Sequence, residues 1–463
     1  MAISQGLLVW LLINSLGNKV SDFQQKLQKR SLENYSAESC QNQLNRELNS
    51  HLWVMHRNPP VYFFGTIHVP YTKVWDYIPS NSKRAFKTAK NVYFELDLTD
   101  QSNLRTLELC KSLPRGIKLR DVLPPSMYKR IKTHLSYIRG KLSEWIMLEQ
   151  AFTGLDPSRL YQQMTKSWRK KRPIWIMLLL GKLTEYNVRM IAHGLPVLDT
   201  YLMQEALSSH KKLGSIETVK EQCQVLNKLN NSKAIFALNQ TLMLHEKMRR
   251  GEQNLPVTTK QLVYHYNCGD LKEVLFSQET SGIANLANTS ETNSFQREKK
   301  RRFEEDMKEE LFFKRNKKMA KRIAKIVNEE PKKIKFFALG AGHFIGSKSI
   351  IGILQSQGYN ISHLKASDPL PRYGRDRNAK DCRLKKKKHG RKNGRKQNRK
   401  RFRSRKACNN VIQREQLVTK PKTTLCTSCE TPMPTGFTEA FSSSISGHGH
   451  QLWMVTFVLV VFS

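Results

Sequence analysis

The segment Val61–His68, VYFFGTIH, places four residues typical of a buried strand before a glycine, with a histidine three positions after that glycine. The segment Lys335–His343, KFFALGAGH, repeats this layout. Glycine lets the chain turn sharply after a strand, and open α/β sheets place their sites at the carboxyl ends of strands. The two segments therefore predict two histidines at the rim of one sheet. A histidine that only hydrogen-bonds at a strand end is the alternative for either copy alone.

The Gly-x-x-His spacing alone is weak evidence, because a third copy, Gly447 to His450, lies in a Ser-rich segment near the C-terminus. The sequence context is stronger. The copies that end at His68 and His343 both follow an apolar strand that carries a Phe-Phe pair. We therefore retain these two histidines as site candidates and discard the third copy.

Strand-like segments alternate with helical patterns through the middle of the chain. The predicted strands are Val61–Thr66, Val92–Leu98, Val197–Tyr201 and Lys335–Leu339. The predicted helices are Ser80–Lys90, Phe303–Asn328 and Ser347–Gln357. We expect an α/β fold with a central mixed sheet flanked by helices, in one domain over residues 51–366 with a polar surface insertion at about 281–300.

Both ends of the chain predict a secretory protein. The apolar run Leu7–Leu16 predicts a signal peptide, residues 1–17, followed by a polar leader, residues 18–50. A buried N-terminal helix is the alternative for that run. The apolar run Leu452–Phe462 is short for a spanning helix and follows a serine cluster. Residues 442–463 therefore predict a membrane anchor, either a GPI-attachment signal or a short single-pass segment.

The charge of the chain is extreme, at a formal net +41 for 463 residues. Fifteen Lys or Arg and no acid lie between residues 383 and 406, inside a basic tail, residues 367–441, that we expect to be disordered. Such charge predicts a polyanionic neighbour, such as heparan sulfate or an anionic membrane surface. A solvated low-complexity tail is the alternative. The secretory features oppose a nucleic-acid partner.

Cysteines and glycosylation acceptors fit an oxidising, secretory compartment. Four cysteines in or near the predicted domain allow two disulfides with three pairings, between which the sequence does not choose; they are Cys40, Cys110, Cys223 and Cys268. Five Asn-X-Ser/Thr acceptors predict a glycoprotein; they are Asn34, Asn230, Asn239, Asn288 and Asn360.

Glu95 lies in the apolar segment VYFELDL, where a buried carboxylate is costly unless a cation pairs with it. One interpretation is an ion pair with Arg or Lys. The other joins Glu95 to His68 and His343, since two neutral imidazoles and a carboxylate suit a divalent first-row metal that promotes hydrolysis. Glu95 would then be the third ligand or the general base that takes a proton from the attacking water. Asp199 is a weaker candidate for the same rim, with a helix N-cap as its alternative.

Seven segments between about Leu52 and Ser362 together resemble the Tiki metalloproteases, animal members of the TraB-domain superfamily that are similar to bacterial pheromone-shutdown proteins and to the erythromycin esterase-like fold. The segments are FFGTIHVPYTKVWDYIPSNSKRAF, YFELDLTD, KRPIWIMLLL, GLPVLDTYLMQEA, IFALNQTL, HYNCGDL and FFALGAGHFIG. The signature of that family is two Gly-x-x-His motifs and a glutamate. Here these positions fall on His68, His343 and Glu95. The basic tail is not part of the resemblance.

The resemblance implies a metal-dependent protease supported by Mn²⁺ or Co²⁺, with Zn²⁺ not excluded. It implies that the substrates are secreted Wnt proteins, which lose N-terminal residues, so that Wnt signalling is inhibited. It also implies an extracellular catalytic domain at the plasma membrane, tethered by a single-pass or lipid anchor. The competing hypothesis is a non-catalytic cell-surface protein that binds Wnt or heparan-type glycan.

Overall fold

The computed structural model describes residues 48–147, 154–252, 259–272, 298, 301–302, 305–306, 308–371 and 373. The predicted signal peptide, nearly all of the leader, most of the surface insertion, the basic tail beyond residue 373 and the C-terminal anchor lie outside these residues. Within the described part of the chain, no helix is long and apolar enough to cross a membrane.

A six-stranded mixed sheet lies at the centre of the domain, in the order β4-β3-β5-β2-β1-β6. The strands are β1 Leu52–Met55, β2 Val61–Thr66, β3 Asn91–Phe94, β4 Lys212–Ser215, β5 Lys335–Gly340 and β6 Ile361–Leu364. β2, β5, β3 and β4 run parallel, whereas β1 is antiparallel to both β2 and β6. This arrangement confirms the predicted α/β fold with a mixed sheet.

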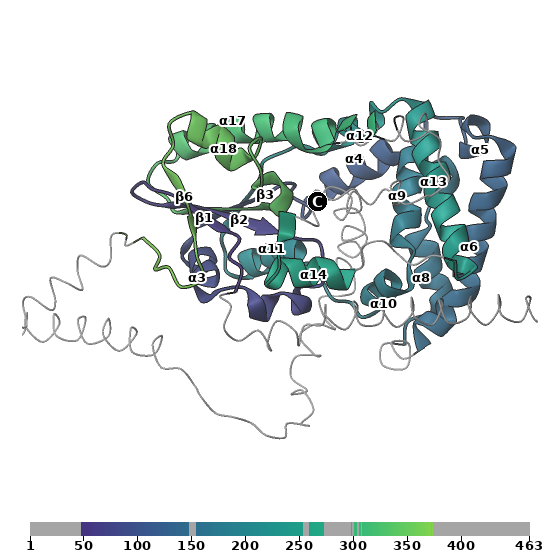
Figure 1. Cartoon of the computed structure of the whole chain (residues 1–463), viewed down its shortest axis with the longest axis horizontal. Helices are drawn as coiled ribbons and strands as arrows, with labels where there is room; N and C mark the ends of the chain where they lie inside the picture. Colours follow the sequence, from purple (N-terminus) through teal and green to yellow (C-terminus); the bar gives the residue numbers. More distant parts are fainter. Residues whose placement is uncertain are drawn as a thin grey trace, which may run out of the picture.

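Helices cover both faces of the sheet (Figure 1). One face packs against α17, Lys314–Glu329, and α18, Ile350–Ser356. The other packs against α3, Ser80–Thr88, and α11, Leu198–Ser208. Because both faces are covered, strands β2 and β5 are buried at every position, as expected for central parallel strands.

Two pairs of phenylalanines join the central strands, one pair on each face of the sheet. Phe63 stacks on Phe337 with ring centroids 5.4 Å apart, within the core cluster under α17 and α18. Phe64 lies 5.7 Å from Phe336 in the opposite cluster. The Phe-Phe pairs that marked both strands in the sequence therefore fix β2 beside β5.

Most of the remaining helices form a largely helical part beside the sheet, on the right of Figure 1. They are α4 Gln101–Lys111, α5 Leu119–Val122, α6 Pro125–Trp145, α8 Pro157–Met164, α9 Pro173–Lys182, α10 Glu185–Ala192, α12 Val219–Asn227 and α13 Asn231–Arg249. Helix α14, Thr259–Asn267, instead lies against the sheet, where the Tyr266 hydroxyl donates to the Gly65 carbonyl of β2 at 2.7 Å. Every residue of α9 from Pro173 to Leu180 is buried. One apolar cluster runs from this helical part to the sheet face under α3 and α11, so the two parts share a core.

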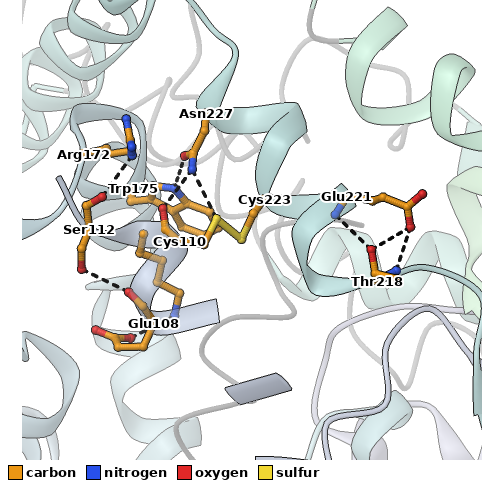
Figure 2. Close-up of a disulfide and its surroundings, with 10 residues drawn as sticks. Glu108, Cys110, Ser112, Arg172, Trp175, Thr218, Glu221, Cys223 and Asn227 are labelled. Carbon is orange, nitrogen blue, oxygen red and sulfur yellow. Dashed lines mark hydrogen bonds and ion pairs between the residues drawn. A yellow bond between two sulfur atoms is a disulfide. The ribbon is translucent and has the colours of Figure 1, made fainter. Parts of the chain in front are cut away.

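A disulfide joins Cys110, in α4, to Cys223, in α12 (Figure 2). Asn227 supports this link, because its amide nitrogen donates to the Cys110 carbonyl at 2.9 Å and its amide oxygen accepts from the Trp175 indole at 2.9 Å. Cys268 is also disulfide-bonded. The structure thus selects one of the cysteine pairings that the sequence left open.

The predicted strand Val197–Tyr201 is wrong. Val197 forms only an isolated bridge with Pro70, and α11 begins at Leu198. The reason is the spacing of the apolar residues that follow, since Leu198, Leu202 and Ala206 recur every four residues and are buried on one face of the helix.

Two other predicted elements differ in length. The strand expected over Val92–Leu98 ends at Phe94, because the Glu95 side chain accepts the Gly340 N–H at 2.9 Å where the ladder would have continued. The helix expected over Phe303–Asn328 is helical at residues 305, 306 and 308, forms a π-helical turn at Glu309–Phe313 and continues as α17 to Glu329, one residue past the predicted end.

Candidate metal centre

The three site residues predicted from the sequence follow three adjacent parallel strands. His68 comes two residues after β2, and His343 ends the 3₁₀ turn Ala341–His343 directly after β5. Glu95 directly follows β3. Because these strands lie in the order β3-β5-β2, their carboxyl ends carry Glu95, His343 and His68 at one edge of the sheet. All three are buried, with exposed fractions of 6%, 0% and 8%.

His68 is oriented by Asp199. Its Nδ1 lies 2.6 Å from Asp199 Oδ2, and the Thr66 hydroxyl donates to Asp199 Oδ1. Burial opposes the charge of Asp199, but His68 and Thr66 outweigh burial and hold the pKa of Asp199 below its usual value. The ionised carboxylate can only accept, so Nδ1 carries a hydrogen, and in the neutral ring the lone pair lies on Nε2.

His343 is oriented in the same way by an amide. Its Nδ1 lies 2.6 Å from Asn316 Oδ1, and Asn316 Nδ2 donates to the Lys348 carbonyl at 2.8 Å. The bond to the Lys348 carbonyl fixes the orientation of the Asn316 amide, so Asn316 Oδ1 accepts a hydrogen bond from the imidazole of His343. Burial, reinforced by the nearby charge of Arg315, lowers the pKa of His343 to about 3. His343 is therefore neutral at physiological pH, with its lone pair on Nε2.

The Nε2 atoms of His68 and His343 are both buried and make no hydrogen bond within the described residues. A buried polar atom without a partner is costly. A histidine whose Nδ1 is held by a carboxylate or carbonyl oxygen, with Nε2 left open, has the arrangement of a metal-ligating histidine. Both imidazoles therefore fit a divalent metal. In the described part of the chain, no group of three or more His, Cys, Asp or Glu side chains is arranged to hold a metal ion, so the structure offers two candidate ligand nitrogens and not a complete ligand set.

Glu95 faces both His343 and Arg315. Its Oε1 lies 3.5 Å from His343 Nε2 and accepts the Gly340 N–H, while its Oε2 lies 2.7 Å from Arg315 Nη2. Gln222 Nε2 donates to the same Oε2 at 3.2 Å. The ion pair considered as the alternative in the sequence is thus present, and it coexists with the approach to His343.

Arg315 is shared between two buried carboxylates. Its Nη2 lies 2.6 Å from Glu217 Oε2 in addition to the contact with Glu95, and its Nε donates to both Glu217 oxygens, at 3.0 and 3.1 Å. Burial disfavours the guanidinium charge, but Glu217 and Glu95 hold the pKa of Arg315 above its usual value. The site therefore contains a fixed positive charge beside Glu95.

Sequence reasoning missed four of the residues that build this site; they are Arg315, Asn316, Glu217 and Gln222. A signal existed for one of them. Leu311, Arg315, Met319 and Ile323 recur every four residues, which places an arginine in the apolar stripe of a helix. A charged residue on a buried stripe indicates a buried partner. No comparable local pattern marks Glu217 or Gln222.

Comparison with known proteins identifies the family of this site. The family model described as the TraB/PrgY/gumN family matches residues 51–363. A "Metalloprotease TIKI homolog" of Nematostella vectensis is 47% identical over 331 residues, which cover 71% of this chain and 70% of that protein. The chain belongs to the Tiki metalloproteases of the TraB/PrgY/gumN family.

Other Tiki proteins match the same part of the chain. "Metalloprotease TIKI1" of Danio rerio is 46% identical over 326 residues, covering 70% of this chain and 65% of that protein. "Metalloprotease TIKI1" of Homo sapiens is 44% identical over 324 residues, covering 70% and 64%. No solved structure matches. The names of these relatives confirm the predicted enzyme class, a metalloprotease. The match spans about two thirds of their length.

Proposed function

We propose that this Tiki-family chain cleaves N-terminal residues from secreted Wnt proteins at the cell surface and thereby negatively regulates Wnt signalling. The observation that carries the catalytic part is the pair of buried imidazoles of His68 and His343, whose Nε2 atoms are oriented and without hydrogen bonds in the described chain. Open α/β sheets bind ligands at the carboxyl ends of their strands, and a divalent metal held there would activate water for peptide hydrolysis. The choice of Wnt proteins rests on the family resemblance.

The proposed metal ligands are His68 Nε2, His343 Nε2 and Glu95, with Mn²⁺ or Co²⁺ as the proposed ion and Zn²⁺ as the alternative. A bound divalent ion polarises a peptide carbonyl and acidifies water. Glu95 Oε1 is the oxygen available to ligate or to take a proton. It accepts one hydrogen bond, from Gly340, whereas Oε2 is bound by Arg315 and Gln222.

The surrounding residues hold this chemistry in place. Asp199 and Asn316 keep both histidines in the Nδ1–H tautomer, which leaves Nε2 as the donor atom for a metal. Arg315 balances the charge of Glu95, and Glu217 holds Arg315 in turn. A carboxylate fixed in this way does not rotate away from the histidines, which is the preorganisation that catalysis requires.

The proposed setting is the outer surface of the plasma membrane. Residues 1–17 would direct secretion, and residues 442–463 would anchor the chain as a GPI-linked or type I single-pass protein. Asn230 and Asn360 are exposed, so both are accessible glycosylation acceptors. The basic run 383–406 would bind heparan sulfate. Release of the protein from cells by phosphatidylinositol-specific phospholipase C would identify a GPI anchor, and retention would identify a spanning segment.

The second candidate function is a non-catalytic protein that binds Wnt or glycan, which the same basic run would favour. We would test it by comparing wild type, His68→Ala and the exposed control His193→Ala in a Wnt reporter assay. The N-terminus of the ligand would be followed by mass spectrometry. His68→Ala should abolish both cleavage and inhibition, while His193→Ala should retain them. Equal inhibition by all three proteins with an intact ligand would leave only the binding function.

A further inference from the structure

The outward face of α17 carries a straight row of lysines. At about 100° per residue, five lysines fall within a sector of about 100° on the helix. All five are exposed; they are Lys314, Lys317, Lys318, Lys321 and Lys325. With a rise of 1.5 Å per residue, the row is about 16 Å long. Helix α17 lies along the top of the molecule in Figure 1.

The opposite face of the same helix is buried and fixes how the row points. Met319, Ile323 and Val327 pack in the core cluster against the sheet, and Arg315 and Asn316 reach the metal centre. The helix therefore cannot rotate without dismantling both the core and the site. The row of lysines is a rigid surface of the folded domain.

Acidic residues neutralise the two ends of the row but not its middle. Lys314 pairs with Glu310, and Lys325 lies 3.6 Å from Glu329. Lys317, Lys318 and Lys321 form no ion pair with a described residue. The middle of α17 thus presents three uncompensated positive charges within about one turn of helix.

We propose that the outward face of α17 binds a sulfated glycosaminoglycan chain. A linear polyanion complements a straight row of ammonium groups, because successive sulfates along one chain can each meet a lysine and release counterions. Exposed Lys332 and Lys333 extend the positive surface beyond the end of the helix. This surface belongs to the folded domain and is separate from the basic run 383–406.

The lysine row on α17 fits a sulfated glycan better than it fits an anionic membrane or a single-stranded nucleic acid. Helices that lie on a membrane insert an apolar face into it, and the apolar face of α17 is buried in the core. Single-stranded nucleic acids stack on aromatic side chains, and none lies among the residues of the row from Lys314 to Lys325. The Cys110–Cys223 disulfide agrees with an extracellular partner.

The test uses the full-length protein with all fifteen Lys and Arg of 383–406 changed to Gln, so that the tail does not mask the helix. The test variant adds Lys317→Gln, Lys318→Gln and Lys321→Gln. The control variant instead adds Lys129→Gln, Lys132→Gln and Lys166→Gln, three exposed lysines of the helical part. Both variants lose the same charge. Binding to heparin would be measured against salt concentration, with vesicles of phosphatidylcholine and phosphatidylserine as a second probe.

The test variant should bind heparin about tenfold more weakly at physiological salt, as expected when three surface ion pairs are lost. Its slope of log Kd against log salt should fall by up to about three, by analogy with polyanionic DNA. The control variant should change less than twofold in its affinity for heparin, and Lys→Arg at the three α17 positions should retain binding.

Equal loss in the test and control variants would overturn the proposal. So would a loss confined to the vesicles. Wnt cleavage is measured in a separate assay. Failure of the glycan-binding proposal therefore does not affect the proposed protease function, and the reverse also holds.

Discussion

His68 Nδ1 lies 2.6 Å from Asp199 Oδ2, although the two residues are 131 positions apart in the chain. The Thr66 hydroxyl binds the other oxygen of the same carboxylate. One buried acid on α11 therefore sets both the tautomer and the direction of an imidazole that follows β2. The role of Asp199 is to position His68, and it makes no contact with the other histidine.

We predict that Asp199→Asn weakens metal binding and cleavage by about 10- to 100-fold, as expected for removal of a carboxylate that supports a ligating histidine. The amide can accept from His68, but it has no charge and donates as readily as it accepts. Isothermal titration with Mn²⁺ would measure metal affinity independently of activity. The exposed Asp76→Asn is the matched control. Unchanged affinity in Asp199→Asn would show that this pair serves only the fold.

We predict that chelation abolishes cleavage by the wild type and that Mn²⁺ or Co²⁺ restores it. Glu95→Gln should remain inactive after the metal is returned, because an amide neither accepts a proton nor ligates as a carboxylate does. The exposed Glu205→Gln should behave as the wild type. Cleavage of a Wnt ligand, read by mass spectrometry after dialysis, would measure both effects. Full activity in the chelated protein would exclude the proposed metal dependence.

The positions of β2 and β5 could be predicted from sequence because each strand is an apolar run with a glycine at or next to its last residue. Their adjacency could not, because it depends on a pairing across more than 270 residues. The same limit explains why Glu217 was missed. Its contact with Arg315 spans 98 positions and leaves no periodic pattern around Glu217 itself.

The segment that contains Asp199 shows a second reason why a prediction from sequence can fail. VLDTY has the composition of a strand over five residues, but LDTYLMQEAL has the spacing of a helix over ten. The longer pattern decides the structure. Asp199 consequently lies in the first turn of α11, while Val197 occupies the N-cap position, so the alternative interpretation of Asp199 as an N-cap is wrong.

We predict that Arg315→Met destabilises the domain by about 3–5 kcal/mol, because it leaves the carboxylates of Glu95 and Glu217 buried without a cation. Arg322→Met, on the same helix, is the control. Arg322 and its partner Glu221 are both partly exposed, so the loss should be smaller, at about 1 kcal/mol. Urea unfolding would measure the free energy of unfolding of both variants.

Adding Glu217→Gln to Arg315→Met should recover part of the lost stability, since it removes one of the two unpaired charges. No recovery in this double variant would contradict the assignment of Arg315 as the shared cation of Glu95 and Glu217. It would indicate instead that packing of the arginine side chain accounts for the loss.

The last prediction concerns His134, a buried residue of α6 that contacts α13. Its ring centroid is 4.7 Å from that of His245, and Arg249 Nη1 donates to its Nδ1 at 2.7 Å. Burial, reinforced by the nearby His245 and Arg249, lowers the pKa of His134 to about 3. The folded protein therefore holds this imidazole neutral, whereas the unfolded chain binds a proton below pH 6.5.

The stability that His134 contributes is present above pH 6.5 and is lost as the pH falls toward 3, because only the unfolded state takes up the proton in that window. Wild type should lose about 1.4 kcal/mol per pH unit more than His134→Gln between pH 6 and pH 4. Urea unfolding at several pH values would measure the two slopes. The exposed His193→Gln, outside the α6–α13 contact, is the matched control. Equal slopes for wild type and His134→Gln would mean that His134 becomes protonated without unfolding the α6–α13 contact.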